Sequence, residues 1–327
     1  MKFIGRKFNF GIGREVARGT GVASAFWLPH TEISFDEKVE QVKDDGVIGV
    51  IEGQSDAKVV KKYAEGSLSS IINDDSFGLV LNATFGSSVV TGPSDSAYTH
   101  TFSVLQSAQH SSLTLNVDEP NASGSGALRF PLCMIDSLDV DFEVGQFPTF
   151  SMAFVSNISS VQTASPSYTA PDNFKPQDGV IRIADTYANL ATGTSYAVRK
   201  VSLSFAKNLE DDHNIGSVAV TDRLNKQFQV SGSLEMVYND REFADSFMLA
   251  DLTRALQIKF TNTAKTIGAS TNPSITFKIA KVKFQEIARS ISKDDITMIT
   301  LSFEGYYSIG DSKMAEAILV NDVASYV

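Results

Sequence analysis

The sequence predicts an all-β fold with minor α content, built as two tandem β-sandwich or split-barrel modules that each carry one flanking helix. Three observations predict it. A short motif occurs twice, apolar and polar residues alternate, and 327 residues suffice for two domains of the commonest size, about 150 residues each. We place the first module with an N-terminal arm at residues 1–160, the connecting segment at 161–195 and the second module at 196–327.

The repeated motif is the main reason to expect two modules. Six identities fall within a window of twelve residues, where chance gives roughly one or none. A chain with two similar modules either binds two similar ligands or fills two similar positions in a symmetric assembly. The structural residues of the motif and their counterparts, each 166 positions apart, are Gly66 and Gly232, Leu68 and Leu234, Asn73 and Asn239, and Phe77 and Phe243.

Strands are indicated by alternation with a period of two. In residues 138–144, apolar side chains on one face alternate with the acidic side chains Asp139, Asp141 and Glu143 on the other. Because only one face of such a strand is apolar, we expect antiparallel strands that cover a core on one side. The same alternation occurs in further segments, at residues 150–154, 201–205, 280–284 and 299–303.

One helix is expected after the motif in each module. Asn73 is a favourable N-cap, and Phe77 begins an apolar face with helical spacing. In the second module Asn239 is the expected N-cap, and Phe243 and Phe247 lie four residues apart. A strand, a capped helix and further strands are therefore expected twice.

The connecting segment is indicated by its composition. Pro166, Pro171 and Pro176 lie among Ser and Thr residues, and long stretches of this kind are usually linkers or functional loops.

Charge and hydropathy argue against several classes of protein. The formal net charge is -10, whereas proteins that grip a nucleic-acid backbone are normally basic. No segment approaches the roughly 20 apolar residues of a membrane helix, so we expect no membrane anchoring. The first residues lack the apolar run of a secretory signal.

No arrangement of residues points to catalysis. The four histidines lack ligand spacing, and the single cysteine, Cys133, has apolar neighbours that favour a packed thiol. Acidic pairs such as Asp44-Asp45 are interpreted as solvated turn residues, because neighbours on a strand point to opposite faces. We therefore predict that the protein is no enzyme and has no catalytic residues, no cofactor or cofactor-binding residues, and no metal site.

Five short segments of the N-terminal part form a recognisable signature: Gly13–Glu15, Arg18–Thr20, Phe26–Pro29, Ile33–Phe35 and the strand Ala64–Leu68. In these segments the chain resembles the tail tube proteins of long-tailed bacteriophages. The match is good over residues 8–90 and looser to about residue 155, and the second half resembles the family chiefly through its likeness to the first.

The resemblance implies modules of the tail-tube type, in which one sheet joins its neighbours' sheets into an inner barrel. Six modules form a ring, and rings stack through extended loops and terminal arms into a conduit for genome ejection. With two modules per chain, three chains fill a ring. The implied partners are further copies in stacked trimeric rings, the tape measure, terminator and distal tail proteins, and DNA as a non-specific passing cargo. The implied location is the virion tail, after assembly in the host cytoplasm.

The acidic residues Asp139, Asp141 and Glu143 are our candidates for the wall of that conduit. DNA carries about one negative charge per 1.7 Å, so an acidic wall repels it and lets it move. An ordinary solvated outer face is the other interpretation, because alternation does not show where a face points. The alternative function is a carbohydrate- or protein-binding β-sandwich surface protein, and a hydrolase ranks third.

Overall fold

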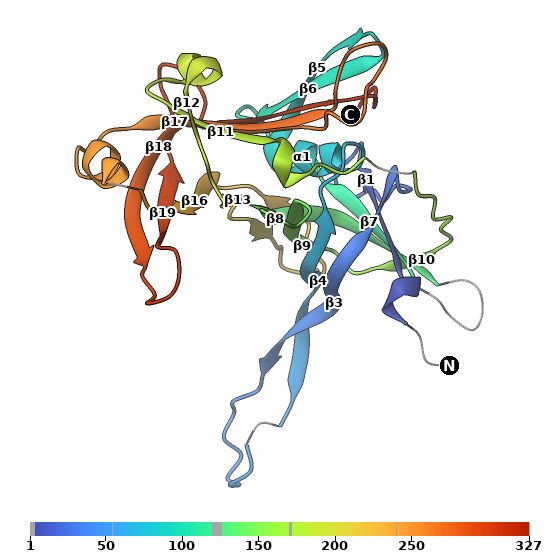
Figure 1. Cartoon of the computed structure of the whole chain (residues 1–327). Helices are drawn as coiled ribbons and strands as arrows, with labels where there is room; N and C mark the ends of the chain where they lie inside the picture. The colour runs from blue at the N-terminus through green and yellow to red at the C-terminus, as the bar shows by residue number, and fades with distance from the viewer. Residues whose placement is uncertain (1–3, 54, 120–125, 170–171, 240, 327) are drawn as a thin grey trace.

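The computed structural model describes residues 4–53, 55–119, 126–169, 172–239 and 241–326, and its chain is mostly β, as expected (Figure 1). The first half contains η1 (Gly5–Lys7), β1 (Asn9–Arg14), β2 (Phe26–Leu28), β3 (His30–Lys43), β4 (Ala57–Ile71), α1 (Phe77–Phe85), β5 (Gly86–Ser94), β6 (Ala97–Val104), β7 (Leu113–Asp118), β8 (Ala127–Glu143), β9 (Thr149–Ser156) and β10 (Ser160–Gln162). The second half contains η2 (Pro176–Asp178), β11 (Gly179–Ala184), η3 (Tyr187–Thr192), β12 (Thr194–Tyr196), β13 (Lys200–Ala206), β14 (Glu210–Asp212), β15 (Asp222–Leu224), β16 (Gln229–Val237), η4 (Phe243–Met248), β17 (Arg254–Thr261), β18 (Ser274–Ser290), β19 (Met298–Gly305) and β20 (Ala315–Asn321).

A central antiparallel sheet runs through both halves of the chain. Its strands follow the order β3, β4, β9, β8, β13, β16, β19 and β18. The halves meet where β8 pairs with β13, with Leu203 opposite Val140. Both residues are at most 1% exposed, so the hydrophobic core continues across this junction.

The two longest strands, β8 and β18, each take part in more than one pairing along their length. The first part of β8 pairs with β7, and its last part pairs with β9 and β13. The first part of β18 pairs with β17 and β20, and its last part pairs with β19. Register shifts interrupt β8 between Ile135 and Ser137 and β18 between Phe284 and Glu286. Such bulges bend a strand, which re-aims its two ends.

The remaining strands extend these two long strands sideways. β1 pairs with β2 and β7, and β11 pairs with β12 and β17. β10 adds to β8, whereas β20 lies between β18 and the hairpin β5–β6. First-half strands are thereby fastened to the second half at two places, through β8–β13 and through β6–β20.

Helix α1 is enclosed by the protein, and all of its residues are buried. The assignment of Asn73 as its N-cap is wrong, because the N-cap is Ser76 and the Asn73 side chain accepts backbone hydrogen bonds from Asp75 and Ser76 in the turn before it. The C-terminal segment covers the helix, and the amide of Asn82 donates a 2.8 Å hydrogen bond to the Tyr326 carbonyl. A helix that is apolar on all sides needs such enclosure.

The second helical segment, η4, is a single π-helical stretch. It begins after Glu242, so the assignment of Asn239 as its N-cap is also wrong. The expected contact between Phe243 and Phe247 is confirmed, with ring centroids 5.3 Å apart. Phe247 also packs against Phe284 of β18, which fastens η4 to the sheet.

The segment expected to connect the modules, residues 161–195, contains regular strands. It holds the end of β10, the whole of β11 and the start of β12, and β11 pairs with β17 along its whole length. Alternation in β11 is short, and the prolines before it dominate the composition of the segment. Among the described residues between β10 and η2, the part without a regular element therefore comprises residues 163–169 and 172–175.

Candidate assembly surfaces

The acidic face of β8 has the predicted arrangement. Asp139, Asp141 and Glu143 are all partly exposed and alternate with fully buried apolar residues, so the structure brings the three carboxylates to one face of the sheet. On the neighbouring strand β13, the Ser202 hydroxyl donates to Asp141 and the Lys200 ammonium lies 3.3 Å from Glu143. With one lysine beside three carboxylates, this face keeps a net negative charge.

The repeated glycines meet the same steric demand. A Cβ added at Gly66 would collide with the carbonyl oxygen of Ser34, and one added at Gly232 would collide with that of Ser202. Each glycine therefore permits a close approach of the neighbouring strand that no other residue allows.

The apolar residues of the motif belong to the hydrophobic core. Leu68, Leu234 and Phe77 are fully buried, and Phe243 packs against the same core. Asn73 organises the turn before α1. Asn239 is exposed and lies between β16 and η4.

The sheet ends in two open edges. Among the described strands β3 pairs only with β4, and from Lys283 to Ser290 strand β18 pairs only with β19. Unpaired backbone N–H and C=O groups on such edges are a template for a strand of another chain.

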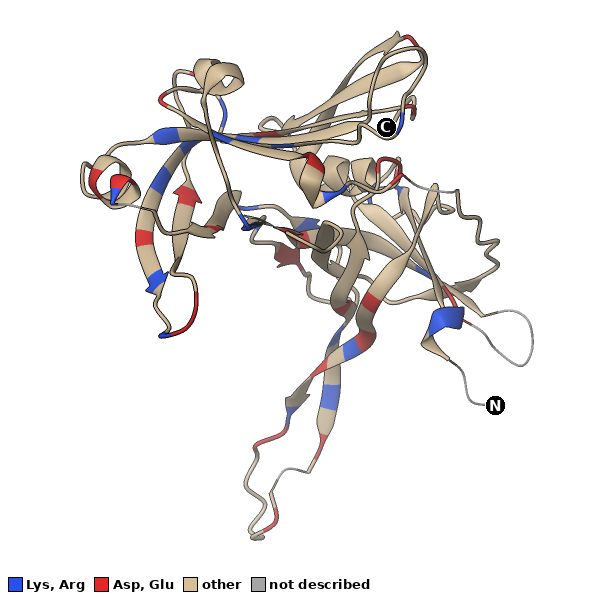
Figure 2. Ribbon diagram, in the orientation of Figure 1, with Lys and Arg blue, Asp and Glu red and all other residues tan. Residues whose placement is uncertain are grey.

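The hairpin β3–β4 projects from the body of the protein (Figure 1). Basic and acidic residues both occur along its arms (Figure 2). Its tip carries four exposed apolar residues, Val47, Ile48, Val50 and Ile51, with 93% of Val47 and 103% of Ile51 accessible. An exposed apolar group at the end of a charged arm is typical of a contact site.

A buried arginine joins the halves, and the sequence analysis did not find it. Arg223 of β15 donates to the Asn157 side chain and to the Ser156 carbonyl, both at 3.0 Å, and its Nε lies 3.1 Å from Asp211. Burial lowers the pKa of Arg223, and Asp211 opposes this shift.

A second polar anchor joins Lys265, in the loop before β18, to the turn before α1. Its ammonium lies 3.1 Å from Asp74 and 2.5 Å from Asp172. Asp74 is fully buried, and burial raises its pKa although Lys265 acts against the shift.

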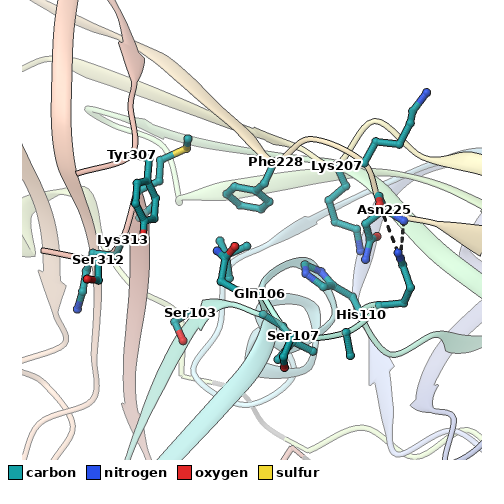
Figure 3. Close-up of a pocket in the computed structure, with 17 residues that line it drawn as sticks. Ser103, Gln106, Ser107, His110, Lys207, Asn225, Phe228, Tyr307, Ser312 and Lys313 are labelled. Atoms are coloured by element: carbon teal, nitrogen blue, oxygen red, sulfur yellow. Dashed lines mark hydrogen bonds between the residues drawn. The ribbon is translucent and has the colours of Figure 1, made fainter. Parts of the chain in front are cut away.

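A cleft of about 750 Å³ opens between the halves, where the segment after β6 faces residues of the second half (Figure 3). At one side the Lys207 ammonium donates 2.9 Å to the carbonyl oxygen of Ala83, near the end of α1. Burial and the charge of Arg18 lower the pKa of Lys207 to about 7. Burial and the charge of Lys207 lower the pKa of His110 to about 4. The other side of the cleft carries Tyr307, Ser312 and Lys313.

Within the described ranges, no group of three or more His, Cys, Asp or Glu side chains could hold a metal ion. Cys133 is buried, as predicted, and burial raises its pKa to about 12. None of the helices that the structure describes is long and apolar enough to cross a membrane.

The family model of the phage tail tube protein matches residues 5–305. The chain belongs to this family. As a tail tube protein it is a structural, non-enzymatic component of the virion tail that polymerises with copies of itself. The resemblance seen in the N-terminal segments is thereby confirmed, and the match extends through β19 of the second half. No curated protein matches this tail tube protein.

Proposed function

We propose that this tail tube protein is a two-module subunit and that three copies close into a ring, which stacks into the conduit for the genome. The observation that carries the proposal is a succession of strand pairings that occurs in each half. The first half pairs its strands in the order β2, β1, β7, β8, β9, β4 and β3. The second half uses β12, β11, β17, β18, β19, β16 and β13 in the same way.

The registers support this equivalence. Leu68 and Leu234 each lie between apolar residues of the strands on either side. The register shift of β8 follows the residue opposite Phe154, and that of β18 follows the residue opposite Phe303, its counterpart. A further shift interrupts both the β7–β8 and the β17–β18 pairing. We assign residues 1–160 to the first module and 196–327 to the second. Strand β11 (Gly179–Ala184) precedes the second range, and we assign it to the second module as well.

Ring closure follows from the two open edges. The edges at β3 and at β18 belong to different strands, so contact between copies is head-to-tail, and such contacts form a ring where the rotation from copy to copy closes. Two modules per chain let three chains fill six similar positions, and a closed barrel leaves no edge exposed.

The acidic face of β8 is our proposal for the wall of the bore. Asp139, Asp141 and Glu143 lie on the face of the central sheet opposite the core, and the net charge of -10 adds to the repulsion of DNA. DNA then passes as a non-specific cargo. The tape measure, terminator and distal tail proteins are the further partners we expect, with assembly in the host cytoplasm.

The hairpin β3–β4 is our proposal for the contact between stacked rings. The hairpin projects from the body, and apolar residues are exposed at its tip, so we expect the tip to contact a second copy in the next ring.

Electron microscopy of the purified full chain tests the ring. We expect annuli with a central hole and three-fold symmetry, and light scattering of a single ring should give three times the 35.4 kDa chain mass. A protein that stays monomeric at every concentration contradicts the proposal, and rings with another number of chains contradict its stoichiometry.

A further inference from the structure

We infer that the last part of β18 pairs with β3 of the next copy, in the antiparallel register that β8 and β13 use inside one chain. The inference rests on the proposed ring and adds which residues meet. The open edges at β18 and β3 are the surfaces concerned, and the partner is a second copy of this chain.

The β8–β13 junction is the template, because it joins the first half to the second within one chain. Apolar residues meet there and are all at most 3% exposed. The opposed pairs are Phe142 and Val201, Val140 and Leu203, and Leu138 and Phe205.

The position of β13 maps onto β3 through the repeated motif. Val201 lies opposite Leu234, and Ile33 lies opposite Leu68. Since Leu68 and Leu234 are counterparts, Ile33 occupies in β3 the position that Val201 occupies in β13.

The position of β8 maps onto β18 through the strands beside them, which are β9 in the first half and β19 in the second. Leu138 lies opposite Met152, the residue that Leu68 also faces. Ile287 lies opposite Leu301, the residue that Leu234 also faces. Ile287 is therefore the counterpart of Leu138.

The two mappings fix the pairs between copies. With β3 written first and β18 of the neighbouring copy second, they are Ile33 and Ile291, Ser34 and Ser290, Phe35 and Arg289, Asp36 and Ala288, Glu37 and Ile287, and Lys38 and Glu286.

Exposure at equivalent positions supports this junction. Phe142 lies opposite Val201 of β13, its ring stacks on that of Phe260 in the second half, and it is 3% exposed, whereas its counterpart Ile291 is 74% exposed. Leu203 is 1% exposed, whereas its counterpart Phe35 is only partly buried. Four of the six counterparts are apolar and at least partly exposed, so covering them buries apolar area: Ile33, Phe35, Ile287 and Ile291. The other two, Glu37 and Arg289, are charged and exposed.

Charge also fits the register. Lys38 of β3 is placed opposite Glu286 of β18, and directly opposed charges of unlike sign favour strand pairing. Both side chains are exposed in the single chain, where the Lys38 ammonium lies 2.6 Å from Glu65 of β4.

Disulfide trapping tests the register. Directly opposed residues of antiparallel strands have Cα atoms about 4.5–5.5 Å apart, within the range that a disulfide spans. We would prepare Ser34→Cys/Ser290→Cys and a second in-register variant, Asp36→Cys/Ala288→Cys. The matched control is Ser34→Cys/Ala288→Cys, whose partners lie on a diagonal, beyond easy reach. Cys133 remains in place, because its buried thiol does not react.

After oxidation and separation without reductant, both in-register variants should lose most of their monomer band to dimers and trimers, and the ladder should stop at three chains. The diagonal control should stay monomeric on the gel. A bond within one chain adds no mass, so the ladder reports contacts between copies. Microscopy of the unsubstituted protein is the separate readout of the ring.

Rings without a ladder from either in-register pair, or a ladder mainly from the diagonal control, overturn the register and leave the proposed ring standing. The absence of rings from the unsubstituted protein overturns both.

Discussion

The guanidinium of Arg223 donates a 3.0 Å hydrogen bond to the carbonyl oxygen of Ser156, and this contact ties the second half of the chain to the last residue of β9. The same side chain reaches Asn157 and Asp211. One fully buried cation therefore satisfies groups from both halves, and its removal leaves several buried polar groups without partners.

Substituting Arg223→Ala should lower the free energy of unfolding by about 3 kcal/mol or more, because a buried pair that loses one partner leaves an uncompensated charge and unpaired carbonyls. Urea denaturation of the unassembled protein measures this loss in the free energy of unfolding. The matched control is Lys226→Ala, which removes an exposed ion pair with Glu210 and should cost less than about 1 kcal/mol. Equal effects of the two substitutions contradict the role of Arg223.

Substituting Gly66→Ala should destabilise the unassembled protein by about 2 kcal/mol, because the new Cβ collides with the Ser34 carbonyl. Gly232→Ala should do the same at Ser202. Gly53→Ala is the control, since no atom lies within 4 Å of its added Cβ. Thermal unfolding of the three variants checks this, and an unchanged midpoint for Gly66→Ala argues against the close approach of β3 and β4.

The pKa of His110 is lowered from 6.5 to about 4 in the folded chain. Between these two pH values the unfolded chain therefore binds a proton at this residue, whereas the folded chain does not. The free energy of unfolding should therefore fall as the pH drops from about 6.5 to 4, by on the order of 2 kcal/mol from this group. Denaturation at pH 7 and at pH 4.5 measures the loss. His110→Gln should show a smaller loss, and an equal loss in the variant assigns the pH dependence to other groups.

The pKa of Lys207 is lowered to about 7, and the sign of its effect is the same. Between about pH 7 and 10.5 the unfolded chain holds a proton that the folded chain has released, so the contribution of this group to stability rises with pH. Relative to Lys207→Met, the unsubstituted protein should gain about 2 kcal/mol between pH 7 and pH 9. A difference between the two proteins that does not change over this range rules out a titrating amine.

Replacing Asp139, Asp141 and Glu143 by lysine should leave rings able to form and make them retain short duplex DNA. Binding should weaken steeply with salt, since each phosphate contact releases counterions. The control reverses three acids elsewhere, at Asp185, Glu210 and Asp245, with the same change in net charge. Filter binding compares the two, and equal retention by the control shows that net charge, not the face of β8, governs passage.

Sequence patterns predicted the parts of this fold that depend on local order. The alternation is confirmed at residues 138–143, because successive residues of a half-buried strand point to opposite faces, whereas Val144 follows the end of β8 and is exposed. The helix after Asn73 was found but its start was misplaced, since an asparagine can order a turn as readily as cap a helix. Arg223 and Lys265 were missed, because their partners lie far away in the chain and no local spacing marks them.

The pairing of β8 with β13 links the first half to the second half within each copy. Because both strands belong to one polypeptide, the two halves are always present in equal number and always alternate, whatever the expression level. Each half can then diverge on its own, and the long β3–β4 arm in one half contrasts with the short β14–β15 ribbon in the other. A ring made from such chains carries a projecting arm at every second position only.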